Sequence, residues 1–318
     1  MHQLNQELKL AVIIPLYNES EVLSDLRVAV DKMVAELPAA VSVYFIDDGS
    51  RDDTLDKVLE WTGESPHIYV VSLSRNFGHQ AAIAAGLDQV GEEVDYVVIM
   101  DGDLQDPPEL VAEMLDKARE GFDVVYARRR SREGETGWKR GTSKVFYRIL
   151  RLLTPIEIPE DVGDFRLISR MALEAFRQMP EHHKFLRGMF AWIGFSQAEV
   201  LFDRPTRAAG ETKYPTRRMV SLAWHAATSF SSTPLRLAML PGVISILIGI
   251  CYCMYSLIRH LRGETVPGWT ALVFLVSMFG GSLLFAIWVM GEYIAKIYEE
   301  VKHRPHYLIK LTAGGYEE

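Results

Sequence analysis

Cysteine is scarce in this chain, and positive charge is not in excess. The 318 residues include only two cysteines, Cys251 and Cys253, and both lie in an apolar run. Residues at i and i+2 point to different faces of a helix, so neither a disulfide nor a shared metal ion is favoured. The formal net charge is −8. This argues against a nucleic-acid-binding protein, because such proteins present a basic face.

Further absences narrow the class of protein. Residues 1–9 are polar and lack the apolar core of a signal peptide, so we expect the first domain to stay in the cytoplasm. No Gly-x-Gly-x-x-Gly follows the first apolar run, where Asn18 and Glu19 stand instead. This argues against a Rossmann dehydrogenase. The sequence has no internal repeat and no low-complexity tract.

Short apolar runs alternate with helical periods from residue 10 to about residue 126. The runs are rich in valine and isoleucine, as strands buried on both faces are. Strands that alternate with helices predict an α/β domain with a doubly wound, mostly parallel sheet, whose ligands bind at the carboxyl ends of the strands. The predicted strands are residues 10–15, 41–47, 68–73, 96–100, 123–126 and about 197–202, and the predicted helices are about 20–37, 52–61, 80–90, 107–120 and 169–179.

Two carboxylates directly follow the fourth apolar run, in Asp101-x-Asp103. Acidic side chains at the end of a buried strand are costly unless a cation meets them. Gln105 adds a third oxygen ligand, and hard oxygen ligands suit Mg²⁺ or Mn²⁺, with substrate phosphates completing the shell. The alternative is a helix-capping aspartate, which fits Asp106 better than Asp101 or Asp103. The pattern predicts an enzyme that handles a nucleotide-activated substrate.

Polar residues also follow the first and second apolar runs. Tyr17 could stack on a base, and Glu19 could bond a nucleotide or sugar hydroxyl. Asp48 could accept hydrogen bonds from a base or a ribose. The alternative for each motif is a simple strand-to-helix turn, capped by Asn18 in the first motif and by Ser50 or Asp52 in the second.

The chain changes character after residue 214. Residues 216–232 are amphipathic and suit a membrane interface. Residues 237–258 and 269–291 carry no charge, and each run exceeds the ~20 residues that cross a bilayer core of ~30 Å. The short connection predicts a hairpin, and flanking basic residues favour a cytoplasmic catalytic domain; the alternative is a buried hairpin in a soluble core. The predicted parts are a catalytic domain (1–214), an interfacial segment (215–235), two transmembrane helices (236–294) and a cytoplasmic tail (295–318).

Together, these motifs on successive strand ends resemble glycosyltransferase family 2, the inverting enzymes of the GT-A fold. The resemblance covers essentially the whole chain. Further segments are similar to the branch that glycosylates polyprenyl phosphates. That branch includes bactoprenol glucosyltransferases, undecaprenyl-phosphate formamido-arabinose transferases and, more distantly, dolichyl-phosphate mannose synthases. The segments are residues 75–79, 162–166 around Asp164, 185–188, 209–214 and 304–307.

The resemblance also implies site residues. The implied nucleotide-sugar-binding residues are Pro15, Tyr17, Glu19, Asp48, Ser50, Asp101, Gly102, Arg207 and Lys213. The implied metal ligands are Asp101, Asp103 and Gln105. The implied catalytic residues are Asp103 and Asp164, and Asp164 is either a base or a group that orients Arg166 or a sugar hydroxyl. The candidates for gripping the lipid phosphate are Arg128, Arg129 and Arg132, for which a solvated basic loop is the alternative.

The implied reaction moves a sugar from a UDP-sugar to undecaprenyl phosphate, with inversion. Overall likeness favours glucose, with formamido-arabinose or mannose as alternatives. A phosphate monoester is mostly ionised at neutral pH because its second pKa is ~6. Charge compensation and in-line placement therefore matter more than deprotonation.

The same resemblance implies a setting. It implies Mg²⁺ or Mn²⁺ as cofactor, a homotetramer, and a multi-pass protein of the bacterial inner membrane that serves cell-envelope glycans such as lipopolysaccharide. One rival is a processive polysaccharide synthase, but the chain has no Gln-x-x-Arg-Trp motif and few spans for a pore. Another rival is a non-enzymatic membrane scaffold, against which the intact Asp101, Asp103 and Gln105 argue.

Overall fold

The computed structural model describes residues 8–130, 162–181, 184–203, 233–263 and 268–315. These residues fall into two compact units. The first unit holds the described residues up to 203 together with residues 305–315, and the second holds residues 233–263 and 268–304. Residues 215–232 of the predicted interfacial segment lie outside the described residues.

The first unit is built on an eight-stranded sheet with the order β7-β5-β6-β4-β1-β2-β3-β8. Neighbouring strands from β4 through β1 and β2 to β3 run parallel, whereas β6 and β8 run antiparallel to the strands beside them. The predicted α/β class is confirmed, with a mixed sheet. The strands are β1 (Lys9–Leu16), β2 (Ala40–Asp47), β3 (Ile68–Leu73), β4 (Tyr96–Ile99), β5 (Val124–Arg129), β6 (Val162–Ser169), β7 (Gln197–Phe202) and β8 (Ile309–Gly314).

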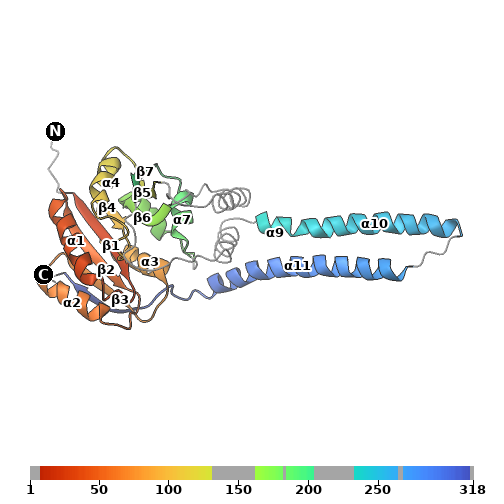
Figure 1. Cartoon of the computed structure of the whole chain (residues 1–318), viewed down its shortest axis with the longest axis horizontal. Helices are drawn as coiled ribbons and strands as arrows, with labels where there is room; N and C mark the ends of the chain where they lie inside the picture. Colours follow the sequence, from red (N-terminus) through yellow and green to blue (C-terminus); the bar gives the residue numbers. More distant parts are fainter. Residues whose placement is uncertain (1–7, 131–161, 182–183, 204–232, 264–267, 316–318) are drawn as a thin grey trace. The chain divides into compact units, whose positions relative to one another are not determined.

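Helices cover both faces of this sheet (Figure 1). On one face, Val12, Ile14 and Phe45 pack with apolar residues of three helices, α1, α2 and α4. The other face carries α3, where a Cβ added at Gly86 would come within 2.5 Å of Ile13. The helices of this unit are α1 (Leu23–Glu36), α2 (Thr54–Glu64), α3 (His79–Gln89), α4 (Leu110–Arg119), α6 (Arg170–Arg177) and α7 (Leu186–Trp192).

Two strands of the sheet were not predicted from the sequence. One is β6, and the other is β8, which lies in the segment predicted to be a tail. β8 pairs antiparallel with β3 at the edge of the sheet. Just before β8, Leu308 O accepts a hydrogen bond of 2.8 Å from Ser74 N. Tyr307 Oη donates one of 2.7 Å to Asp88 Oδ2. The chain after the second apolar helix is therefore part of the eight-stranded sheet.

The second unit consists of α9 (Thr233–Leu237), α10 (Met239–Leu261) and α11 (Trp269–Val301). By length and composition, Leu235–Leu261 and Phe274–Val301 could each cross a membrane, with mean hydropathies of 2.2 and 1.9. The two long helices contact each other through a 2.8 Å hydrogen bond between the hydroxyls of Ser245 and Ser282. α11 continues past residue 291, the predicted end, because the next residues include the good helix formers alanine, lysine and glutamate.

Candidate active site

Carboxylates gather at the carboxyl ends of β1, β2 and β4, which are parallel neighbours. Burial raises the pKa of Glu19, and so do the nearby charges of Asp103, Asp52 and Asp101. Burial also raises the pKa of Asp101, with a contribution from Asp103. Side chains that follow different strands therefore share one electrostatic environment. A cation placed there would relieve the repulsion among them.

The turn after β1 is tied to the turn after β2. Asn18, at a φ of 53°, donates its N–H to Ser50 Oγ at 3.0 Å, and its side-chain Oδ1 accepts from Arg51 N at 2.8 Å. Glu19 N donates to Thr54 Oγ1. The turn interpretation thus explains Asn18 and Ser50, but neither residue caps a helix, because the N-caps of α1 and α2 are Val22 and Asp53. Tyr17, next to them, remains 40% exposed, as stacking on a base requires.

Asp48 holds the loop that follows β3. Its two carboxylate oxygens accept backbone N–H bonds from Phe77 at 2.7 Å and Gly78 at 2.9 Å. Burial raises the pKa of Asp48, and these two hydrogen bonds partly offset the effect. Gly49 adopts a φ of +69°, and a Cβ there would lie 2.4 Å from the carbonyl carbon of Arg75. Asp48 therefore shapes the site by fixing a loop, whatever else it binds.

The predicted metal ligands present two oxygens without hydrogen bonds. Asp101 Oδ1 and Gln105 Oε1 are buried, and neither has a hydrogen-bond partner among the residues that the structure describes. Asp103 Oδ1 accepts a 3.1 Å bond from Gln105 N. In the described parts of the chain, no group of three or more histidine, cysteine, aspartate or glutamate side chains could hold a metal ion. A dication here would rest on two carboxylates, one amide and the oxygens of the substrate, a donor set that fits Mg²⁺ or Mn²⁺.

Close packing against β1 sets the shape of the turn that carries Asp101 and Asp103. A Cβ added at Gly102 would lie 2.6 Å from Leu16 Cδ2 and 3.4 Å from Pro15 O. Pro15 therefore packs behind the turn at Gly102 and helps to fix its shape. Asp106 Oδ2 accepts from Asp101 N at 3.3 Å, and burial raises the pKa of Asp106 to about 7, with the charge of Asp101 adding to the shift.

Asp164 is the centre of a polar network and is 6% exposed. It accepts from Arg187 Nε at 3.0 Å and Gln80 Nε2 at 2.9 Å, and it lies 3.7 Å from Arg166 Nη2. Burial alone would raise the pKa of Asp164. A hydrogen bond with His79 and the charges of Arg187 and Arg166 outweigh it and hold the pKa well below the usual range. An aspartate that stays ionised under these conditions is a weak proton acceptor and a strong anchor for cations.

His79 joins Asp164 to the predicted metal ligands. Its Nε2 lies 3.3 Å from Asp101 Oδ1 and 3.4 Å from Asp164 Oδ2. Burial favours the neutral ring, but the bond to Asp164 and the charge of Asp101 raise the pKa of His79. Gln80 Oε1 accepts from Leu186 N at 3.1 Å, which ties α3 to α7. His79 and Arg187 lie in two segments that resemble the family, residues 75–79 and 185–188, but the sequence alone indicates no role for either residue.

Of the remaining predicted residues, Arg128 and Arg129 lie in β5, and the others lie outside the described residues. Arg128 Nη1 donates to Glu199 Oε2 at 2.8 Å in a pair that is 45% and 38% exposed. Arg129 lies in β5, and its charge lowers the pKa of Asp106. The predictions that fall outside the described residues are Arg132, Arg207 and Lys213.

An α/β sheet with carboxylates at its parallel strand ends, followed in the sequence by two membrane-length helices, fits the class predicted from the sequence, a glycosyltransferase. Comparison with known proteins agrees: the chain belongs to Glycosyl transferase family 2, whose sequence profile matches residues 11–177. It is 40% identical over 308 residues to the uncharacterized glycosyltransferase sll0501 of Synechocystis sp. (strain ATCC 27184 / PCC 6803 / Kazusa), with 96% of each chain covered. The predicted family and its GT-A type of sheet are confirmed.

Two further similarities concern proteins with named activities. The chain is 35% identical over 309 residues to the SfII prophage-derived bactoprenol glucosyl transferase of Shigella flexneri, covering 97% of this chain and 99% of that one. A crystal structure of glucosyl-3-phosphoglycerate synthase from Mycobacterium tuberculosis, in complex with Mn²⁺, UDP and glucosyl-3-phosphoglycerate, aligns with a TM-score of 0.46 and 16% identity. That alignment covers 70% of this chain and 78% of the other.

Proposed function

We propose that this protein transfers a sugar from a UDP-sugar to the phosphate of a membrane polyprenyl phosphate, with inversion. The observation that carries the proposal is the group of carboxylates at the strand ends, with the two buried oxygens of Asp101 and Gln105 that lack hydrogen bonds. Full-length similarity to bactoprenol glucosyl transferases supports undecaprenyl phosphate as acceptor and glucose as the sugar. Formamido-arabinose is the main alternative.

Asp101, Asp103 and Gln105 would hold Mg²⁺ or Mn²⁺. When bound, the dication would offset the charge that builds on the departing diphosphate. Tyr17 would stack on the base, and Glu19 would bond a hydroxyl of the donor. Both residues follow β1, beside the carboxylates that follow β4.

Asp164 would act as a positioning residue in this reaction. Its low pKa makes it a poor base, and the acceptor phosphate is already mostly ionised near neutral pH. Its contacts instead keep Arg187, Gln80 and His79 in place. The nucleophile then needs placement and charge compensation, and the network around Asp164 supplies both.

The position of β8 in the sheet supports the predicted membrane topology. Strands β7 and β8 flank the helical hairpin in the sequence, and both belong to the first unit. Both ends of the hairpin would then lie on one side of the membrane. The excess of basic residues near these ends favours the cytoplasmic side of a bacterial inner membrane. The homotetramer implied by the resemblance stays a prediction, which the native mass in detergent tests.

The test of the proposed function incubates the purified full-length protein with undecaprenyl phosphate and a panel of UDP-sugars. We expect one donor to give a lipid-phosphate sugar and UDP. EDTA should abolish the transfer, and added Mg²⁺ or Mn²⁺ should restore it. Asp103→Asn should lose on the order of 100-fold in rate, a usual loss for removal of one stabilising group at a reacting centre. The control is Asp116→Asn, whose side chain on α4 is 72% exposed.

Two results would count against the proposal. Transfer that survives EDTA and the Asp103→Asn change would contradict the assignment of the metal ligands. If no donor yields a lipid product, a non-enzymatic membrane scaffold becomes the better interpretation.

A further inference from the structure

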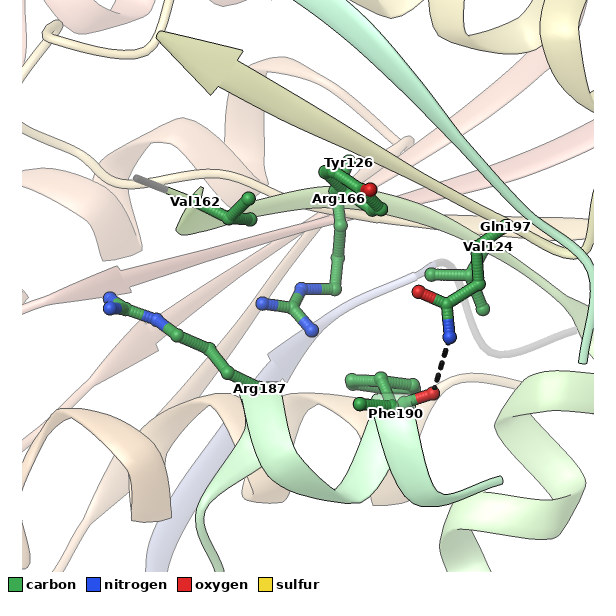
Figure 2. Close-up of a pocket in the computed structure, with 8 residues that line it drawn as sticks. Val124, Tyr126, Val162, Arg166, Arg187, Phe190 and Gln197 are labelled. Atoms are coloured by element: carbon green, nitrogen blue, oxygen red, sulfur yellow. Dashed lines mark hydrogen bonds between the residues drawn. The ribbon is translucent and has the colours of Figure 1, made fainter. Parts of the chain in front are cut away.

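A small pocket lies next to Asp164, between the sheet and α7 (Figure 2). Figure 2 shows Arg166 extending from β6 and Arg187 extending from α7 into the space between these two elements. Tyr126 and Gln197 are the other polar residues of the lining, and the rest of it is apolar. The described lining thus includes two guanidinium groups and no carboxylate.

Both arginines lie close to the Asp164 carboxylate. Arg166 is 3% exposed, and its Nε and Nη2 donate to the main-chain oxygens of Asp164 and Gly163 at 3.2 and 3.0 Å, so these bonds bring it no negative charge. Its guanidinium also lies over the Phe190 ring, 5.0 Å from the centroid. Arg187 binds both oxygens of Asp164, at 3.0 and 3.4 Å. Among the described residues that line the pocket, two carry guanidinium groups and none carries a carboxylate, a lining that is suited to an anion.

The pocket is also close to the place of the proposed reaction. Asp164 joins Arg187 to His79, and His79 in turn lies 3.3 Å from Asp101, a predicted metal ligand. Arg128, by contrast, is paired with Glu199 at 2.8 Å. The Asp164 carboxylate grips the Arg187 guanidinium at two points, which fixes the orientation of the group. A fixed guanidinium is well suited to a phosphate, through charge-assisted hydrogen bonds.

We propose that Arg187, backed by the buried Arg166, binds the phosphate monoester of the acceptor lipid. This inference rests on the proposed function and gives the segment Phe185-Leu186-Arg187-Gly188 a role. The donor also carries phosphate, in its diphosphate group. The test therefore has to separate binding of the acceptor phosphate from binding of the donor diphosphate.

The experiment compares Arg187→Gln and Arg187→Lys with the wild type, each as the full-length protein in detergent. Three quantities are measured: the KM for undecaprenyl phosphate, the KM for the UDP-sugar, and the hydrolysis of the UDP-sugar without acceptor. For Arg187→Gln we expect the lipid KM to rise by about 10- to 100-fold, the usual effect of losing hydrogen bonds to a charged group. The donor KM should rise much less than the lipid KM, which separates binding of the acceptor from binding of the donor. Arg187→Lys, which keeps the charge and loses the planar fork, should fall between.

The matched control is Arg170→Gln. This exposed arginine on α6 pairs with Glu174, and its replacement should change none of the three quantities. The melting temperature of each variant is measured as well. If Arg187→Gln unfolds, Arg187→Lys carries the comparison.

The outcomes separate this inference from the proposed function. A lipid KM that stays at the wild-type value in both Arg187 variants overturns the assignment. A rise in the donor KM with an unchanged lipid KM overturns it too, and assigns the pocket to the diphosphate. Failure of the wild type to glycosylate any lipid phosphate is a different result, because it removes the proposed function itself.

Discussion

Replacement of Asp164 with asparagine tests whether this carboxylate positions other groups or removes a proton. The change keeps the size of the side chain and removes its charge. The new amide would point an N–H donor toward groups that are themselves donors, Arg187 and Gln80. We expect kcat/KM to fall on the order of 100-fold, because small displacements near reacting groups cost that much.

The same change should lower the stability of the protein. Loss of one partner from a buried ion pair costs about 3–5 kcal/mol. Arg187 and His79 are 36% and 43% exposed, so solvent screening reduces the cost to about 2–3 kcal/mol. In a domain of this size, a loss of that order lowers the melting temperature by about 5–10 °C. The exposed Asp116→Asn control should melt within about 2 °C of the wild type.

The pH dependence of stability and of rate tests whether Asp164 positions other groups or acts as a base. The pKa of Asp164 is far below its ordinary value of 3.8. A group with a lowered pKa in the folded state contributes stability above its unfolded pKa and loses that contribution as the pH falls. The difference in melting temperature between wild type and Asp164→Asn should therefore shrink below about pH 4. It should also shrink as the pH rises through the pKa of His79, because the bond to Asp164 raises that pKa.

The rate profile supplies the result that would refute this reasoning. The acceptor phosphate, whose second pKa is ~6, should give a limb of kcat/KM near pH 6, apart from any limb that His79 contributes. The limb from the phosphate should persist in the residual activity of Asp164→Asn. A limb between pH 5 and pH 8 that the wild type and a His79→Gln variant both show and Asp164→Asn lacks would identify Asp164 as a base.

Two further predictions concern the frame of the site. Gly49→Ala should destabilise the protein by about 2–3 kcal/mol, because a left-handed φ and a 2.4 Å approach to Arg75 both oppose a side chain. The control is Gly63→Ala in α2, where an added Cβ meets nothing within 4 Å, and this change should raise stability by about 0.5–1 kcal/mol. Thermal melts measure both variants, and equal changes in their stability would contradict the argument. Tyr307→Phe loses the hydrogen bond to Asp88, which contributes about 0.5–1.5 kcal/mol. The backbone amides of β8 should therefore exchange hydrogen faster in this variant than in the wild type. Unchanged exchange would show that the strand pairing alone holds β8.

Continuous apolar runs identified the interior strands, and the two strands that were missed have a different character. β6 mixes Gly163, Asp164 and Arg166 with apolar residues. It stays buried because Arg166 bonds the main-chain oxygens of its own strand. β8 is mostly exposed at the edge of the sheet. Main-chain pairing with β3 stabilises β8, and such pairing leaves little pattern in a sequence.

The candidate site divides in the same way. The position of Asp101 and Asp103 directly after a buried strand could be recognised locally, because a strand end and its polar residues are neighbours in the chain. The network around Asp164 could not. Gln80 and Asp164 are 84 residues apart, and Arg187 comes from a third element. Only the folded sheet and the helices upon it bring these side chains together.

The charges around Asp164 fit the chemistry of an acceptor that is already ionised. A hydroxyl acceptor would need a base whose pKa lies near the working pH. Arg166, Arg187 and His79 instead surround Asp164 and hold its pKa low. An aspartate with so low a pKa removes protons poorly, whereas the cationic groups around it can bind an anion without removing a proton from it. If Asp164 is shown to act as a base, the phosphate acceptor proposed for this chain loses its main electrostatic argument.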